Sequence, residues 1–219
     1  MKNLIFSFLI VTFIIFNSQN IIAQNISKID NYYIELCEEF DLAFKNRNKD
    51  NFIEINKKIN FEHFLGENGL KFLKLKLSIL TIIDNYDHAF FVFNEFKYLF
   101  NNEREVLFAQ AVLSYKTGNE YRNYFHEAFK IIFLENNKTE SDLVLLYILC
   151  IILDRIEKEN IKQELFTIAK NNEMTLLIES IDEMEIEDLI FGIGNSTGFI
   201  ITIPILFYEH QDPNSNWWE

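Results

Sequence analysis

Residues 106–134, VLFAQAVLSYKTGNEYRNYFHEAFKIIFL, indicate the fold class most clearly. Apolar residues recur every three or four positions, which predicts one helix over 106–115 and a second over 121–134. Between them stand Lys116, Thr117 and Gly118, and glycine favours the left-handed conformation that commonly ends a helix. Because so short a link leaves little room, the two helices are expected to be antiparallel neighbours.

The same helical period recurs along the chain outward from this stretch. Further helices are expected over 29–44, 52–61, 70–83, 85–100, 143–156, 161–170 and 174–181. Thr139, Ser141 or Asp142 is expected to cap the helix over 143–156. Two prolines and six glycines in 219 residues are too few for an architecture of strands and turns. We therefore expect a mostly all-α fold of antiparallel helix pairs, arranged as an irregular bundle or a short α-solenoid.

Two stretches resemble the tetratricopeptide repeat, a family of paired helices. Four residues match the pattern of the second helix of this repeat: Tyr86, Ala89, Phe93 and Phe96. The family's turn matches three: Tyr115, Gly118 and Asn119. The two stretches repeat at about 36 residues instead of the family's 34, and no proline closes either one. The resemblance covers about residues 70–135 and implies stacked helix pairs that bind another protein.

The N-terminus is typical of a cleavable export signal. Lys2 precedes an apolar run from Leu4 to Phe16, which is shorter than a comfortable bilayer span. Cleavage after Ala23 would start the mature chain at Gln24 and deliver it to the periplasm or the outside of the cell. An uncleaved membrane anchor is the less favoured alternative. Residues 1–23 are therefore set apart from a helical domain over 24–188.

Residues 189–208, LIFGIGNSTGFIITIPILFY, depart from the helical pattern. Their β-branched residues favour strands, so Leu189–Ile193 and Phe199–Leu206 are expected to pair as a small C-terminal β-hairpin. A membrane span is not favoured, because Asn195, Ser196 and Thr197 would be costly in hydrocarbon. An exposed apolar edge for a partner is a further alternative. The whole segment 189–219 is expected to pack on the helical domain.

Aromatic residues are the candidate contacts for a partner. Trp217 and Trp218 end the chain just before Glu219, and they either pack back onto the fold or form a docking tail. With the helical positions named above, the candidate partner-contact residues are Tyr86, Phe93, Tyr115, Trp217 and Trp218.

Composition and motifs restrict the chemistry. The net charge of −13 disfavours binding to nucleic acid. No catalytic motif, cofactor site or metal site is predicted, although Asp84 and His88 lie one helical turn apart. Cys37 and Cys150 either pair in an oxidising compartment or stay as buried thiols. The expected function is an exported protein-binding or scaffold module; the alternative is a cell-envelope enzyme or an immunity-type inhibitor whose site is assembled from scattered residues.

Overall fold

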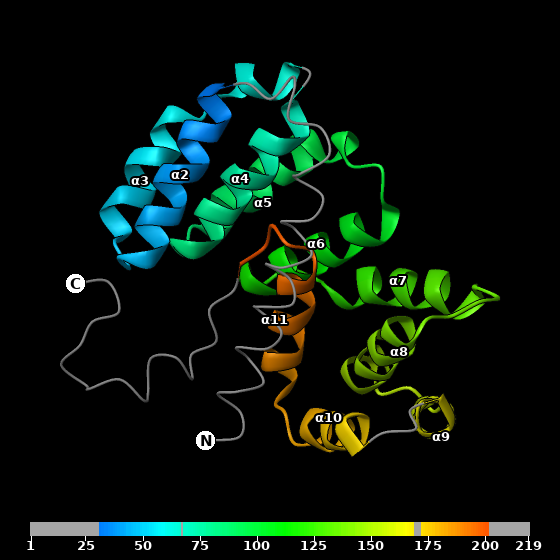
Figure 1. The fold of residues 1–219 in the computed structure, drawn as a ribbon. Helices are drawn as coiled ribbons and strands as arrows, with labels where there is room; N and C mark the ends of the chain where they lie inside the picture. The colour runs from blue at the N-terminus through cyan, green and yellow to red at the C-terminus, as the bar shows by residue number, and fades with distance from the viewer. Residues whose placement is uncertain (1–30, 67, 169–171, 202–219) are drawn as a thin grey trace. The chain divides into compact units, whose positions relative to one another are not determined.

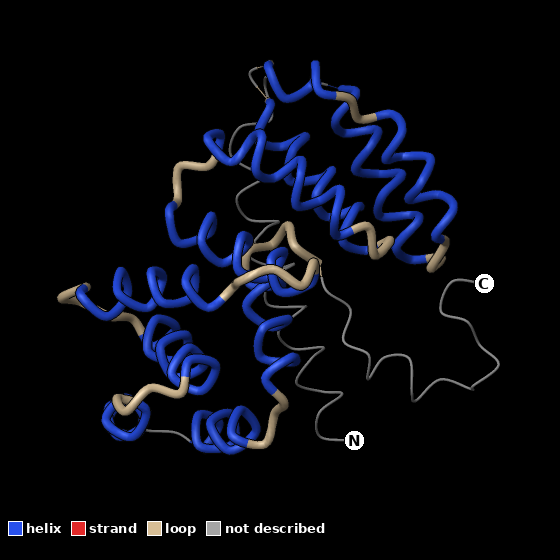
Figure 2. The backbone as a smooth tube through the Cα atoms, turned by 180° about the vertical axis from the view of Figure 1, so that it is seen from behind, coloured by secondary structure: helices blue, strands red, loops and turns tan. Residues whose placement is uncertain are grey.

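The computed structural model describes residues 31–201 except 67 and 169–171. The described chain forms two compact units: unit 1 comprises residues 31–101 and 195–201, and unit 2 comprises residues 102–194. Every regular element of the described residues is a helix (Figures 1 and 2). The all-α prediction is therefore confirmed.

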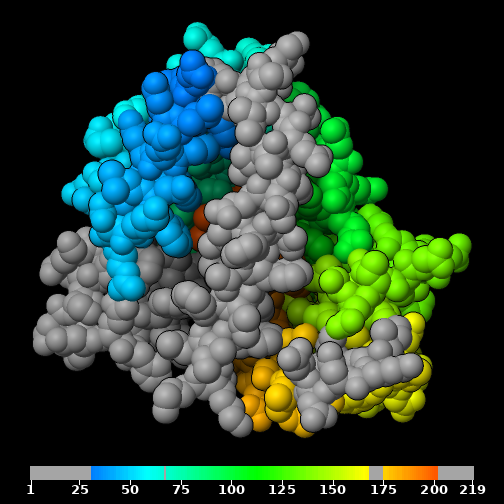
Figure 3. Space-filling view, in the orientation of Figure 1, coloured from blue at the N-terminus to red at the C-terminus, as the bar shows by residue number. Residues whose placement is uncertain are grey.

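Unit 1 contains four α-helices and two 3₁₀ helices in the described residues. They are α2 (Asn31–Lys45), α3 (Lys49–Lys58), η2 (Phe61–Leu65), α4 (Gly69–Ile82), α5 (Tyr86–Phe96) and η3 (Lys97–Leu99). Consecutive α-helices pack against each other, and α2 and α3 lie side by side on the face that Figure 3 shows. Asn48 and Asn85 begin α3 and α5, since each side chain accepts a hydrogen bond from a first-turn amide.

Helix α4 supplies most of the core of unit 1. Leu73, Leu77 and Leu80 are fully buried. Ala89 of α5 is also fully buried, and its small side chain lets the two helices approach closely. Gly69 begins α4 where a Cβ atom would lie only 2.0 Å from the Phe64 carbonyl oxygen, so no other residue fits without a shift of the backbone.

Unit 2 contains the remaining helices. They are α6 (Glu103–Lys116), α7 (Arg122–Leu134), α8 (Glu140–Leu153), α9 (Lys158–Ile168), α10 (Asn172–Asp182) and α11 (Ile186–Ser196), whose last two residues count with unit 1. From α6 to α10, consecutive helices pack against each other. Thr139 caps α8 in a capping box with Asp142, which confirms one of the three predicted caps.

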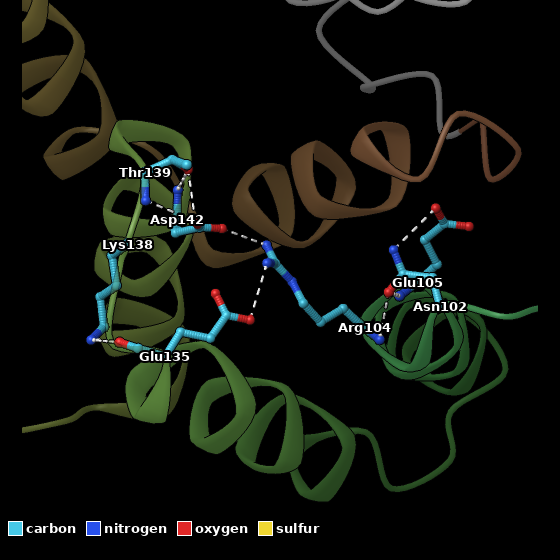
Figure 4. A network of polar contacts seen from close by, with 7 residues as sticks. All are labelled: Asn102, Arg104, Glu105, Glu135, Lys138, Thr139 and Asp142. Carbon is cyan, nitrogen blue, oxygen red and sulfur yellow. Dashed lines mark hydrogen bonds and ion pairs between the residues drawn. The ribbon is translucent and has the colours of Figure 1, made fainter. Parts of the chain in front are cut away.

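A polar network ties the start of α6 to the start of α8 (Figure 4). Arg104 donates from Nη2 to Asp142 Oδ1 over 2.8 Å and lies 3.7 Å from Glu135 Oε1. Burial would raise the pKa of Asp142, but hydrogen bonds from Thr139 and Arg104 outweigh it and lower that pKa below its usual value. The carboxylate therefore caps α8 and anchors α6 at once.

Four helices of the described chain, α2, α4, α6 and α8, are followed by the same kind of turn. In each turn, one residue just after the helix has a left-handed backbone, with φ between 52° and 71°: Arg47, Asp84, Gly118 and Asp154. The next amide donates to the carbonyl five residues earlier over 2.8–3.0 Å: Asn48 to Ala43, Asn85 to Leu80, Asn119 to Ser114 and Arg155 to Cys150. This is the Schellman turn, and it recurs after 37, 34 and 36 residues.

The hairpin prediction is wrong at its first strand. Leu189–Ile193 lies within α11, where Leu189, Ile190 and Ile193 are buried. A helix pairs most of its backbone amides internally, and in this segment tertiary burial outweighed the strand preference of the β-branched residues. The expected boundary between residues 188 and 189 falls inside this helix. Most of the second strand lies outside the described residues, and no helix of the described part is long and apolar enough to cross a membrane.

Candidate functional site

The structure places the predicted partner-contact residues in different surroundings. Tyr86 is half-buried at the start of α5, whereas Phe93 is fully buried and packs on Phe100, so it belongs to the core of unit 1. Tyr115 is half-buried in unit 2, with its ring edge-on to Tyr121 at 5.1 Å. Trp217 and Trp218 lie outside the described residues.

Unit 1 has an open pocket of about 200 Å³, and Tyr86, Phe93 and Tyr115 do not line it. Its lining residues are Ile59, Asn60, Phe61, Lys76 and His88. They come from the end of α3, the start of η2, the middle of α4 and the first turn of α5. The pocket therefore lies where two consecutive helix pairs meet.

Lys76 is the charged group of this pocket. The residue is only 7% exposed, and its Nζ donates to the carbonyl oxygens of Asn56 and Ile59 over 2.7 and 2.8 Å. These carbonyls end α3, where the helix dipole favours a cation. Burial lowers the pKa of Lys76 to about 8, because desolvation disfavours the charged amine.

His88 adds an imidazole to the pocket. Burial, and then the nearby charge of Lys76, lower its pKa below the usual value for histidine, which favours the uncharged ring. A pocket that gathers His88 with carboxylates would favour an enzyme, but here the charged neighbour is a lysine. Among the described residues, no three His, Cys, Asp or Glu side chains are grouped to hold a metal ion.

An aromatic cluster of four rings adjoins the pocket. Phe61, which lines the pocket, stacks on Phe96 at 5.5 Å, and Phe64 and Tyr98 also pack against Phe96, at 4.8 and 6.2 Å. Phe64 is buried, but Phe61 is 48% exposed and Tyr98 66% exposed. Leu65, the last residue of η2, is 75% exposed. We call the exposed rings Phe61 and Tyr98 the aromatic surface.

Sequence reasoning missed this site. Phe61 appeared only as the end of an expected helix, and Lys76 was not singled out. A lysine at a position that the helical period assigns to the buried face was the available signal, because an unpaired cation is seldom buried without acceptors. The acceptors, which are the carbonyls ending α3, become visible only in the folded chain.

The two cysteines are free thiols in this structure, Cys37 in unit 1 and Cys150 in unit 2. Cys150 is buried, and burial raises its pKa to about 11. Burial also raises the pKa of Cys37, against the opposing effect of a hydrogen bond with Tyr33. Neither thiol has the lowered pKa of a nucleophile.

Comparisons of this chain with protein-family models, curated proteins and solved structures find no match.

Proposed function

We propose that the mature chain is an exported, helical binding protein and that unit 1 contacts a partner protein through the aromatic surface around the Lys76 pocket. The observation that carries the proposal is the exposure of Phe61 and Tyr98. A cluster of four packed rings gains most when all are buried, yet two of them are largely exposed to solvent. Large apolar side chains grouped beside a pocket are typical of the centre of a protein interface.

The repeated turns support the helical-repeat part of the proposal. Four Schellman turns at intervals of 34–37 residues agree with the resemblance to tetratricopeptide repeats. Repeats of this kind bury their faces against neighbouring pairs and use the remaining face for binding. The net charge of −13 disfavours a nucleic-acid partner, since phosphates would be repelled.

Site-specific photo-crosslinking tests the aromatic surface. Benzoylphenylalanine would replace Tyr98 in the full-length chain, expressed in its own cells, and the adducts of the exported fraction would be resolved by mass. We expect one discrete partner adduct that Phe61→Ala reduces at least tenfold. The matched control carries the crosslinker at Phe91, which is 54% exposed on α5 outside the cluster.

Two results would contradict the proposal. The first is the same set of adducts from Phe91 as from Tyr98, which would indicate unspecific contacts. The second is a discrete adduct at Tyr98 that Phe61→Ala leaves unchanged. Export is tested in the same cells: the mass of the exported chain should correspond to a start at Gln24.

A further inference from the structure

Residues Phe199–Ile201 lie on helix α4 although 121 positions separate Phe199 from Ser78. Ser78 Oγ donates to the Phe199 carbonyl oxygen over 3.2 Å, and the Ile201 amide donates to Thr81 Oγ1 over 3.0 Å. Ser78 and Thr81 are 6% and 1% exposed. Two buried hydroxyls of α4 therefore bind the backbone of this segment.

Three positions on one face of α4 contact the segment in order. Lys74, Ser78 and Thr81 are spaced four and then three residues apart, which places them on one face of the helix. Lys74 Nζ lies 5.1 Å from the centre of the Phe199 ring, Ser78 binds the carbonyl of the same residue, and Thr81 binds the amide two residues later.

The side chain of Phe199 has its own binding place. Its ring lies 4.8 Å from the ring of Phe100, and the residue is fully buried. Lys74 Nζ lies within 5.5 Å of both rings, a favourable cation–π arrangement. Ile200 beside it is fully buried as well.

Side-chain hydroxyls make the backbone hydrogen bonds found for this segment. The amides of Phe199 and Ile200 donate to Thr197 Oγ1 over 3.4 and 3.2 Å, after Gly198 turns the chain with a φ of 74°. The segment presents three groups to α4: the ring of Phe199, the carbonyl of Phe199 and the amide of Ile201. A separate peptide can present all three, because none depends on the covalent link to α11.

We propose that this face of α4, formed by Lys74, Ser78 and Thr81 with Phe100, is a recognition site for a short segment of a partner protein. The segment carries an aromatic residue followed by two β-branched apolar residues, and Phe199–Ile201 of the chain itself occupy the site in cis. The site shares no residue with the aromatic surface, so this proposal does not depend on the proposed function.

A labelled peptide of residues 196–203, STGFIITI, tests the site by fluorescence anisotropy against the mature full chain. The tethered segment competes at an effective concentration on the order of millimolar. Ile201→Pro removes the amide that Thr81 binds and so weakens the hold of the tethered segment on the site. This variant should therefore bind the peptide at least tenfold more tightly than the wild type. A peptide with Ala in place of Phe199 should lose at least tenfold.

Three further variants make the test specific. Adding Thr81→Val to Ile201→Pro should weaken peptide binding about tenfold while circular dichroism shows an unchanged helix content. Phe61→Ala with Tyr98→Ala should leave peptide binding unchanged. A peptide with benzoylphenylalanine at position 199, used in millimolar excess over the wild-type chain, should label residues 74–81 without any change to the protein.

The proposal is overturned if folded Ile201→Pro binds the peptide no better than the wild type, or if the photoreactive peptide labels the chain without preference for α4. A concentration-dependent dimer of the wild type that Ile201→Pro abolishes would overturn it in another way. It would identify the occupant as the same segment of a second copy instead of a partner protein.

Discussion

Tyr147 of α8 donates its hydroxyl proton to the carboxylate of Asp182 at the end of α10, and the two oxygens lie 2.6 Å apart. Lys158 and Lys162 of α9 bind the same carboxylate, so a single residue joins three helices of unit 2. Burial would raise the pKa of Asp182, but hydrogen bonds from Lys162, Tyr147 and Lys158 outweigh it and lower that pKa to about 2.

Asp182→Ala should therefore lower the free energy of unfolding by about 2 kcal/mol at pH 7, because it leaves the buried Tyr147 hydroxyl without an acceptor. The carboxylate's pKa is lower in the folded than in the unfolded state. Its stabilisation is thus complete above pH ~4 and is lost as the pH falls from ~4 to ~2. Urea titrations at several pH values check both effects. A variant whose stability falls as steeply in acid as that of the wild type would contradict this role.

The network of Figure 4 predicts an order of effects. Asp142→Ala removes both the Arg104 pair and the hydrogen bonds from Thr139 that complete the capping box of α8, so it should cost about 2 kcal/mol. Arg104→Ala removes only the pair and should cost about 1 kcal/mol. Lys130→Ala, which breaks an exposed pair with Glu127, is the control and should cost less than ~0.5 kcal/mol. Equal losses for Asp142→Ala and Lys130→Ala in urea unfolding would be inconsistent with the network.

Because Lys76 is buried, the free energy of unfolding should change with pH in the alkaline range. Its pKa is about 8 in the folded chain and 10.5 when solvated, so the unfolded state binds more protons between these values. The contribution of Lys76 to folding stability therefore rises with pH across this window. The free energy of unfolding of the wild type, minus that of Lys76→Met, should increase by ~2 kcal/mol from pH 7.5 to pH 10.

The control for this measurement is Lys71→Met, since Lys71 is exposed on the same helix. The corresponding difference for Lys71→Met should stay constant over the same pH range. A constant difference for Lys76→Met as well would show that the amine is solvated in solution.

The repeated turns predict effects of opposite sign. Gly118→Ala places a Cβ atom at a φ of 71° and should cost about 1 kcal/mol. Asp154→Gly relieves the same conformation at a φ of 53° and should add about 0.5–1 kcal/mol. Thermal unfolding of both variants checks the pair, with Asp154→Asn expected to be near neutral because Asn tolerates this backbone. Stabilisation by Gly118→Ala would be incompatible with the Schellman turn.

Local pattern predicted much of the helical content of this chain. Each expected helix corresponds to an observed one, Gly118 is left-handed and Thr139 caps α8. These features depend on residues within about one turn of each other, and the sequence displays such neighbours directly. Three other turns adopt the same conformation without glycine, at Arg47, Asp84 and Asp154. No glycine marked those positions, so the recurrence of the turn became visible only in the structure.

The candidate sites depend on residues that are distant in the sequence. Lys76 receives its acceptors from the end of α3, and Phe199 is buried against Phe100 and α4. Residues 199–201 looked like a strand because β-branched residues favour extended backbone, and their hydrogen-bond partners were expected on a second strand. The sequence by itself determined that the chain is mostly helical and roughly where nine of its helices lie, but not α11. Only the tertiary structure decided which acceptor a buried amine meets and which hydroxyls bind residues 199–201, because chain folding brings those groups together.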